Sequence, residues 1–371
     1  MKIGILTLPL HTNYGGILQA YALQTVLERM GHNAVVFDTD KRLSLPKSPL
    51  TYVKRMVMKL FRKNSIPIFY EKKRNRSYPI ISKHTQCFID KYVHRYIAKH
   101  LEDIKENDFD AIIVGSDQIW RPIYFRSPDW AKTEDAFLAF TKGWDIKRIS
   151  YAASFGVEHK EFSDEDLEKC RKAIERFDAV SVREDVAVDQ CFEYFGVAAK
   201  HVLDPTMLLD REDYVSLIQQ EGEPQSVGTL FEYILDVNLE KIEIIDKISH
   251  ELKLKRFAVK PIDIGKPEER VYPPVTAWLR AFMDAEFVIC DSFHGAVFSI
   301  IFNKPFIVIG NEKRGMSRFN SLLKMFSLEE RMISNLSQIE ICRKSIEWTR
   351  VNAVRKQLQK DSKDFLLTYL A

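Results

Sequence analysis

The fold is decided by residues 286–310, which read EFVICDSFHGAVFSIIFNKPFIVIG. Their pattern predicts a buried strand over 287–290, a polar turn over 291–295, a short apolar helix over 296–302 and a second strand over 305–309. A strand, a helix and a strand at this spacing form a βαβ unit, whose strands run parallel. The stretch therefore predicts an open parallel sheet, in which ligands bind beyond the carboxyl ends of the strands.

Three polar residues of this turn lie where such a sheet places its chemistry. Asp291, Ser292 and His294 offer a carboxylate, a hydroxyl and an imidazole, which can act as base, donor and acid. The turn also opens a helix, and backbone N–H groups and the helix dipole favour an anion there. The alternative is that Asp291 or Ser292 only caps the helix. We take His294 and Asp291 as candidate catalytic residues, and Ser292 and Gly295 as candidate substrate contacts.

The N-terminal residues repeat the same succession of elements. The pattern predicts a strand over 2–8, a turn over 11–16, a helix over 17–30 and a strand over 33–38. Glycines in the turn let backbone N–H groups approach a ligand closely at a helix start. The turn is not G-x-G-x-x-G, so it lacks the dinucleotide fingerprint, and the alternative is a tight connection without a ligand. The candidate substrate-binding residues here are Asn13, Tyr14, Gly15 and Gly16.

Three further strands, predicted over 111–114, 148–153 and 179–182, each end in polar residues. Because the carboxyl ends of parallel strands meet at one edge of a sheet, these residues should converge on one crevice. The residues are Ser116, Asp117, Gln118, Ser154 and Arg183. Arg183 is the candidate for a bidentate contact to an anion, and its alternative is an ion pair with a neighbouring carboxylate.

The totals exclude several classes of protein. The chain has 371 residues and a net charge of +3, which is too small to indicate nucleic acid as the main partner. Its five cysteines are scattered without a CxxC pair, which argues against a disulfide framework and a metal site. No run is long and apolar enough to span a membrane, and the first residues show no signal-peptide pattern. We therefore expect a cytoplasmic protein.

A basic segment interrupts the first half of the chain. Residues 54–76 hold nine Lys or Arg and one Glu, interleaved with apolar side chains. A basic amphipathic segment can lie on the inner face of an anionic membrane, and would suit a substrate that is carried on a lipid. The alternative, which we favour at this point, is a solvated insertion containing a helical hairpin.

Two Rossmann-like halves that face each other across a cleft are the economical architecture for this alternation of elements. We place an N-terminal domain at residues 1–206, with the basic insertion at about 41–108 on the acceptor side. A C-terminal domain follows at 207–336, and a helical tail at 337–371 is expected to pack back on the first domain.

The assembled motifs resemble those of the polysaccharide pyruvyl transferase family. They are, in order along the chain, NYGGILQAYALQ, IIVGSDQIW, ISYAASFG, SVRE, LDPT and CDSFHG, and they extend from Asn13 to Gly295. The resemblance implies a GT-B-like α/β fold and transfer of pyruvate from phosphoenolpyruvate onto two sugar hydroxyls, with a cyclic ketal and phosphate as products. It implies phosphoenolpyruvate as a co-substrate, no further cofactor and no metal. It also places His294 at the donor site.

This chemistry requires cations and helix starts for the donor, an acid near its methylene carbon and a base near the sugar hydroxyl. His294 is assigned the acid or a phosphate contact, the Gly295 N–H the phosphate, and Arg183 the carboxylate. Asp117 or Asp291 is assigned the base. Further phosphate charge is expected from Lys313, Arg314 and Arg318, whose alternative is an exposed basic loop.

Two other functions remain open at this stage. A cleft of this kind also suits a glycosyltransferase that uses a nucleotide sugar, for which Glu312 is the loose candidate to bind a ribose. A binding protein of a surface-polysaccharide pathway, without catalysis, is the third interpretation. The acceptor sugar, which is expected to be lipid-linked or part of a polysaccharide, is not identified by the sequence.

Overall fold

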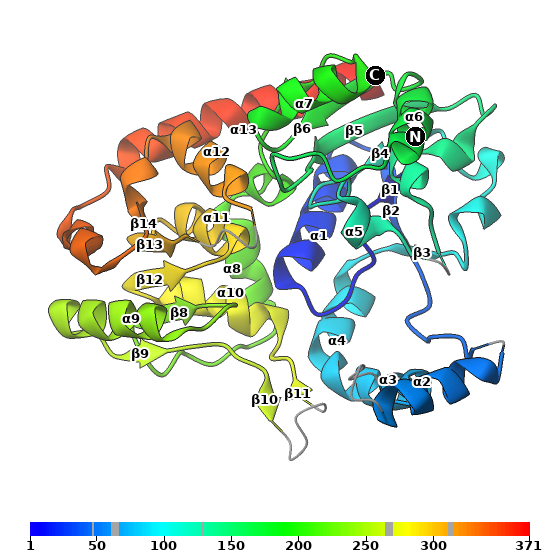
Figure 1. Ribbon diagram of the computed structural model, residues 1–371. Helices are drawn as coiled ribbons and strands as arrows, with labels where there is room; N and C mark the ends of the chain where they lie inside the picture. Colours follow the sequence, from blue (N-terminus) through cyan, green and yellow to red (C-terminus); the bar gives the residue numbers. More distant parts are fainter. Residues whose placement is uncertain (47, 61–66, 128–129, 264–269, 311–314) are drawn as a thin grey trace.

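The structure is a computed structural model that describes residues 1–46, 48–60, 67–127, 130–263, 270–310 and 315–371 (Figure 1). Its first sheet has seven strands, all paired in parallel, in the order β3-β2-β1-β4-β5-β6-β7. The strands are β1 (Lys2–Leu6), β2 (Asn33–Asp38), β3 (Arg95–Ile97), β4 (Ala111–Val114), β5 (Lys147–Ala153), β6 (Ala179–Val182) and β7 (Lys200–His201). The order reverses between β1 and β4, which makes this junction a topological switch point.

The second sheet has five parallel strands in the order β14-β13-β12-β8-β9. They are β8 (Leu230–Tyr233), β9 (Arg256–Phe257), β12 (Phe287–Cys290), β13 (Phe306–Ile309) and β14 (Met332–Ile333). Its switch point lies between β8 and β12. A separate antiparallel pair joins β10 (Ile262–Asp263) to β11 (Arg270–Val271). The predicted fold class, α/β with two parallel sheets in a GT-B-like arrangement, is confirmed.

Alternation along the strands divides the core. In β1, Ile3 and Ile5 belong to a cluster that also contains Val288 and Cys290 of β12, whereas Leu6 belongs to a second cluster that is confined to the first half. Successive side chains of a strand point to opposite faces, so each central strand supplies both faces. The shared cluster between the sheets means that the two halves pack on each other through apolar contacts.

Helices cover both sheets. Those of the first half are α1 (Tyr14–Arg29), α2 (Leu50–Leu60), α3 (Tyr70–Ile81), α4 (Lys83–Tyr92), α5 (Pro122–Phe125), α6 (Asp164–Ile174) and α7 (Val186–Phe195). Those that follow are α8 (Arg211–Gln220), α9 (Leu239–Leu252), α10 (Val275–Asp284), α11 (Phe293–Ile301), α12 (Ser317–Phe326) and α13 (Trp348–Leu370). Short 3₁₀ turns include η5 (Pro205–Leu208) and η8 (Leu336–Arg343). None of the helices in the described parts of the chain is long and apolar enough to cross a bilayer.

The terminal helix α13 contacts both halves (Figure 1). Arg355 donates to the Ile301 carbonyl at 3.5 Å, while the Ser362 hydroxyl accepts from the Leu203 N–H at 3.1 Å. The sequence predicted one helical stretch from residue 337, but the structure ends η8 at Arg343 and begins α13 at Trp348. The helix therefore ties the second half to the first sheet, where it contacts β5 and η5.

Candidate active site

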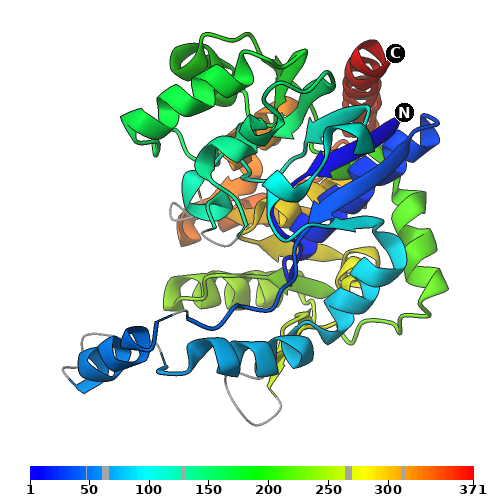
Figure 2. The same ribbon diagram turned by 90° about the vertical axis from the view of Figure 1, so that its right-hand side faces the viewer.

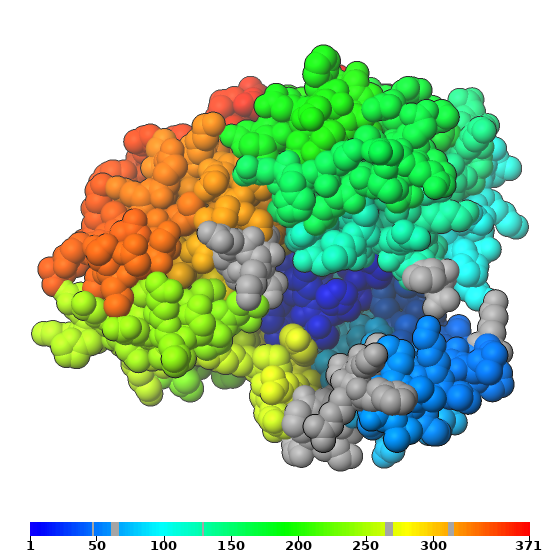
Figure 3. Space-filling model, in the orientation of Figure 1, coloured from blue at the N-terminus to red at the C-terminus, as the bar shows by residue number. Residues whose placement is uncertain are grey.

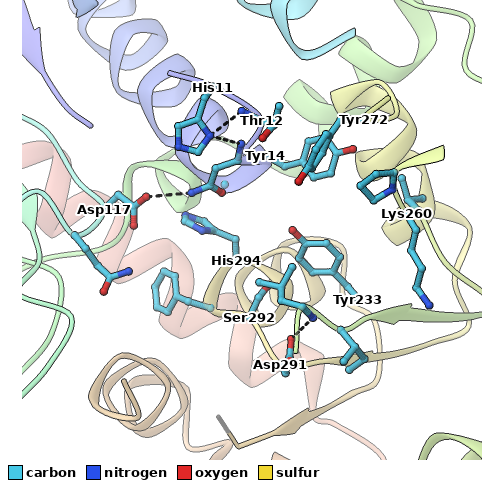
Figure 4. A pocket seen from close by; sticks show the side chains of 18 of the residues that line it. His11, Thr12, Tyr14, Asp117, Tyr233, Lys260, Tyr272, Asp291, Ser292 and His294 are labelled. Carbon is cyan, nitrogen blue, oxygen red and sulfur yellow. Dashed lines mark hydrogen bonds between the residues drawn. The ribbon is translucent and has the colours of Figure 1, made fainter. Parts of the chain in front are cut away.

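A cavity of about 500 Å³ lies between the halves, beyond the carboxyl ends of the strands at both switch points (Figures 3 and 4). Nine of the predicted site residues line it: Asn13, Tyr14, Gly15, Asp117, Gln118, Asp291, Ser292, His294 and Arg318. The other five lie behind the wall or beside it: Gly16, Ser116, Ser154, Arg183 and Gly295. Strand ends of two separate sheets thus contribute to one cavity, as their topology predicts.

The helix α11 begins at Phe293 and not at Ala296, because Ser292 caps it by accepting a hydrogen bond from the Gly295 N–H at 3.0 Å. Asp291 is fully buried; its carboxylate accepts from the Leu235 N–H at 2.7 Å and pairs with the Lys241 ammonium at 2.6 Å. Asp291 therefore holds the loop after β8, and the interpretation of this residue as a base does not fit its contacts. The Gly295 N–H, expected on the phosphate, is used by the cap.

His294 occupies the first turn of α11 and is nearly buried, at 8% exposed. Its Nε2 lies 3.7 Å from an oxygen of Asp204, and among the described residues this nitrogen has no hydrogen-bond partner. The opposite nitrogen, Nδ1, faces Gly15, where an added Cβ would overlap the imidazole. Gly15 is required because a histidine of the second half packs against the backbone of the first half.

The helix α1 begins at Tyr14 rather than at Ile17, so Gly15 and Gly16 lie in its first turn. Its N-cap, Asn13, makes no side-chain cap hydrogen bond; the amide instead points to Asp117, with 3.5 Å between Nδ2 and Oδ2 (Figure 4). The start of α1 therefore keeps backbone N–H groups that its own cap does not satisfy, and it lies beside the start of α11, where His294 packs on Gly15.

Asp117 adopts a left-handed backbone conformation, with φ of 63°. A non-glycine residue in this region is uncommon and is held there by its surroundings, often at functional sites. Its side chain is 7% exposed and lies 3.7 Å from the Arg183 guanidinium. The sequence placed Asp117 at a strand end, and the structure brings it to the same cavity as His294.

Arg183 is engaged in a buried cluster of carboxylates behind the cavity wall. It pairs with Asp204 at 2.8 Å and with Glu184 at 3.4 Å, and Glu184 also accepts from the Ser154 hydroxyl at 2.6 Å. Ser116 donates to Asp204 at 3.2 Å. The structure therefore corresponds to the alternative interpretation of Arg183, an ion pair, and this residue does not line the cavity as a ligand for a carboxylate.

Asp204, from the LDPT motif, is the centre of this cluster. Burial on its own raises the pKa of a carboxyl group, but the neighbouring His294 and the charge of Arg183 together lower the pKa of Asp204 well below its usual range. Asp204 is therefore ionised at neutral pH and presents a negative charge to His294 Nε2. The sequence analysis quoted its motif but assigned no role to Asp204.

Arg318, in the first turn of α12, is the buried cation of the cavity wall. Burial first, and the charge of Arg183 second, lower its pKa to about 10, so the guanidinium remains protonated at neutral pH. The Cζ atoms of Arg183 and Arg318 lie 4.4 Å and 5.9 Å from the centre of the Phe293 ring. The other two predicted phosphate contacts, Lys313 and Arg314, lie outside the described residues, as does Glu312.

The sequence analysis missed five further residues that line the cavity: His11, Tyr124, Tyr233, Lys260 and Tyr272. Figure 4 shows Tyr233, Lys260 and Tyr272 on the side away from Asp117, and His11 beside Thr12 before α1. His11 accepts hydrogen bonds at Nδ1 from the N–H groups of Thr12 and Asn13, at 2.8 and 3.2 Å. One edge of the His11 ring is exposed. Burial of the rest of the ring is the largest effect that lowers the pKa of His11, and the charge of Lys41 is the second. Its place in the turn before α1 was the only signal for His11.

Solved structures similar to this chain include three that it covers almost completely. A UDP-GlcNAc 2-epimerase from Neisseria meningitidis, bound to UDP-GlcNAc, is 9% identical with a TM-score of 0.49, over 100% of this chain and 99% of that chain. The S. aureus MnaA-UDP co-structure is 11% identical, with a TM-score of 0.47 and coverage of 100% and 95%. The spinosyn forosaminyltransferase SpnP is 9% identical, with a TM-score of 0.46 and coverage of 99% and 98%.

A search of curated proteins finds no match to this chain. A family model does match it, over residues 13–313, and this model describes polysaccharide pyruvyl transferases. The match includes every strand from β2 to β13 and the cavity-lining residues from Asn13 to His294, whereas Arg318 and Phe319 of the lining follow its end.

Proposed function

The chain belongs to the polysaccharide pyruvyl transferase family, and on this premise we propose that it transfers pyruvate from phosphoenolpyruvate onto two hydroxyls of a sugar, forming a cyclic ketal and releasing phosphate. The sugar belongs to a surface polysaccharide or its precursor. The observation that carries the proposal is the convergence of two helix starts, a buried guanidinium, an imidazole and a carboxylate on one cavity.

The donor is a small molecule with two anionic groups, a phosphate and a carboxylate. Helix starts and guanidinium groups bind such anions without a metal. The start of α1, whose N-cap makes no side-chain hydrogen bond to it, and the side chain of Arg318 supply these elements. In our assignment Arg318 takes the anionic contact that the sequence analysis gave to Arg183, because Arg318 lines the cavity and Arg183 does not.

His294 is assigned the general acid. Because Asp204 faces Nε2, we assign the proton transfer to the opposite nitrogen, Nδ1, which lies next to the cavity-lining residue Gly15. A proton from His294 to the methylene carbon of the donor turns it into a methyl group and leaves an oxocarbenium-like centre at the neighbouring carbon. Asp204 acts as a positioning residue, since it holds the imidazole without contacting the donor.

Asp117 is assigned the base. One sugar hydroxyl attacks the oxocarbenium-like carbon and gives its proton to the carboxylate, which forms the first carbon–oxygen bond. The bond from this carbon to the phosphate oxygen then breaks, and phosphate leaves with its electron pair. The second hydroxyl attacks the same carbon and gives its proton to His294, which restores the acid, while the proton on Asp117 leaves with the phosphate. Asp117 fits this role because its carboxylate lies at the cavity wall and its backbone is held in an unusual conformation.

The acceptor is assigned to the opposite wall, where Tyr233, Lys260 and Tyr272 lie across the cavity from Asp117 in Figure 4. Aromatic faces with a few polar groups are the usual lining of a site for a small organic molecule. The β10–β11 pair, which follows Lys260 along the chain, places this wall beside the insertion that contains α3.

Calorimetric titration with phosphoenolpyruvate, beside a panel of nucleotide sugars, tests the proposal. We expect phosphoenolpyruvate to bind, Arg318→Ala to weaken it about tenfold or more through loss of a charged contact, and Arg318→Lys to retain part of the affinity. The matched control is Arg350→Ala, an exposed arginine on α13, which should bind like the wild type. Binding of a nucleotide sugar in place of phosphoenolpyruvate would assign the cavity to glycosyl transfer instead.

A further inference from the structure

The helix α2 exposes an apolar stripe to solvent. Its residues Leu50, Val53, Met56, Val57 and Leu60 are spaced for one side of a helix and are between 46% and 77% exposed. No residue of α2 is buried. Five large apolar side chains in water on an eleven-residue helix are unfavourable, because burying apolar surface is the main favourable contribution to folding and association.

The opposite side of α2 is the one that packs on the protein. Arg55 forms a bidentate ion pair with Glu71 of α3, at 2.8 and 2.6 Å, and donates to the Ile68 carbonyl at 3.1 Å. The Tyr52 ring lies 5.4 Å from that of Phe69. These contacts fix which side of the helix turns inward, so the exposure of the stripe follows from how α2 is attached.

Basic side chains accompany the stripe. Lys54 and Lys59 of α2 are exposed, as are Lys72, Lys73 and Arg76 of α3, and the only acidic residue of the two helices is Glu71. Glu71 is neutralised by Arg55. An apolar stripe with a surplus of positive charge beside it is complementary to the surface of a bilayer that contains anionic lipids.

The two helices stand on the side of the molecule where the cavity opens. Figure 3 shows a hollow between the halves, and in Figure 2, where that face is turned to the left, α2 is the segment that projects furthest in this direction. The end of α3 is joined to the acceptor wall, because the Tyr272 N–H donates to the Ile81 carbonyl at 3.0 Å. A surface that binds α2 therefore also lies near the entrance to the cavity.

We propose that α2 docks this protein on an anionic lipid bilayer, with its apolar stripe among the acyl chains and the basic side chains at the headgroups, so that the cavity opens toward a sugar acceptor carried on a membrane lipid. This deepens the proposed function by naming where the acceptor is met, although docking itself requires neither donor nor acceptor. The sequence favoured a solvated insertion; the exposure of the whole stripe reverses that preference.

Sedimentation of the full chain with vesicles tests the proposal. At about 0.1 M salt, where surface charges still attract, we expect binding to mixed phosphatidylcholine–phosphatidylglycerol vesicles to be about tenfold or more stronger than to phosphatidylcholine alone. Val53→Glu with Val57→Glu should abolish it. Lys54→Gln with Lys59→Gln should reduce it about fivefold for each charge removed, with a weaker dependence on salt.

The matched control is Val227→Glu with Phe192→Glu, which places two acids at exposed apolar positions elsewhere on the surface, and it should bind vesicles like the wild type. Thermal unfolding checks that all variants fold. Equal binding to both vesicles, no binding at all, or equal loss in the control would overturn the proposal. So would a dimer in solution that Val53→Glu with Val57→Glu dissociates without any vesicle binding, because the stripe would then belong to a second copy of this chain.

Vesicle binding and pyruvyl transfer are measured separately. Vesicle binding is measured without phosphoenolpyruvate. A protein that binds vesicles but transfers no pyruvate would therefore support docking and contradict the proposed reaction. Transfer to a water-soluble sugar acceptor should be unchanged in the α2 variants, since none of their residues lines the cavity. If an α2 variant lost both vesicle binding and transfer to the soluble sugar, α2 would not be a docking element that is separate from the active site, and the proposal would be overturned.

Discussion

The two strand-to-helix junctions that meet at the cavity satisfy their helix starts in different ways. Before α11, Ser292 caps the helix and Asp291 anchors a neighbouring loop, so both polar side chains are occupied by the protein itself. Before α1, the N-cap Asn13 makes no cap hydrogen bond and turns toward Asp117. The second half therefore builds a rigid support for His294, while the first half leaves N–H groups for a ligand.

This difference shows why polar residues at strand ends cannot be ranked by type alone. Asp117 and Asp291 both follow buried central strands and both line the cavity, yet Asp117 is held in an unusual backbone conformation, whereas Asp291 is bound by backbone N–H groups and a lysine. A carboxylate whose oxygens already accept two or three hydrogen bonds is a structural group. The variants below test the comparison, from the largest expected effect to the smallest.

His294→Ala should lower kcat about a thousandfold, because a positioned general acid contributes roughly two to four orders of magnitude. The fold should remain, since an apolar small residue is tolerated in the first turn of α11. The matched control is His159→Ala, whose side chain is 73% exposed and away from the cavity wall. Turnover in His294→Ala at the level of the control would remove histidine from the reaction.

Asp204→Asn should destabilise the protein by about 3 kcal/mol at neutral pH, because it removes one partner from a buried ion pair with Arg183. The folded state lowers the pKa of Asp204, so its contribution to the free energy of unfolding is present above the ordinary value of 3.8 and is lost as the pH falls below it. Denaturant unfolding of both proteins at several pH values measures this.

The gap between wild type and Asp204→Asn should therefore shrink below about pH 4. A gap that is independent of pH would show that the charge of Asp204 does not contribute. If Asp204 also positions His294, the variant should change the pH profile of kcat more than the KM for the donor, which a purely structural loss would not do.

Gly15→Ala should destabilise the protein by about 2 kcal/mol, since the new methyl group overlaps the His294 imidazole where the halves meet. The matched control is Gly16→Ala, whose Cβ would lie 3.2 Å from the flexible end of Asn13 and should change stability by less than about 0.5 kcal/mol. Adding His294→Ala to Gly15→Ala should restore most of the loss, as a double-mutant cycle can measure. Additive effects would contradict the contact.

The smallest effects compare the two N-caps directly. Ser292→Ala should cost about 1 kcal/mol of stability through the lost cap. Asn13→Ala should leave stability nearly unchanged but lower kcat/KM about tenfold, since its hydrogen bond goes to Asp117. Thermal unfolding and steady-state kinetics of both variants provide the test. The reverse result, a stable Ser292→Ala and an unfolded Asn13→Ala, would mean that the roles of the two junctions are exchanged.

The sequence was sufficient to predict the central strands and helices and to identify the family. Continuous apolar runs identified the central strands, and the order of the motifs identified the polysaccharide pyruvyl transferase family, which the family match confirms. It also named nine of the cavity-lining residues, because polar side chains that directly follow parallel strands lie at one edge of the sheet.

Contacts between segments that are distant along the chain needed the tertiary structure. Arg183 is a strand-end cation in either interpretation, and only the position of Asp204, 21 residues later, makes it a buried ion pair. The wall that we assign to the acceptor comes from Tyr233, Lys260 and Tyr272, whose local sequence has no catalytic pattern. The helix bounds at the cavity also differed from the prediction, since a cap depends on which N–H the side chain reaches.

What the sequence determined by itself is therefore the alternation of strands and helices, the α/β class and the family, because these depend on local periodicity and on residue order. Only the tertiary structure decided which charged side chains form ion pairs within the protein and which line the cavity. It also decided which apolar side chains remain exposed to water. The stripe of α2 has the same spacing as any buried helix face. The stripe is exposed because the opposite side of α2 is attached to α3 through Arg55 and Glu71. The periodicity of the sequence does not specify such a contact between two helices.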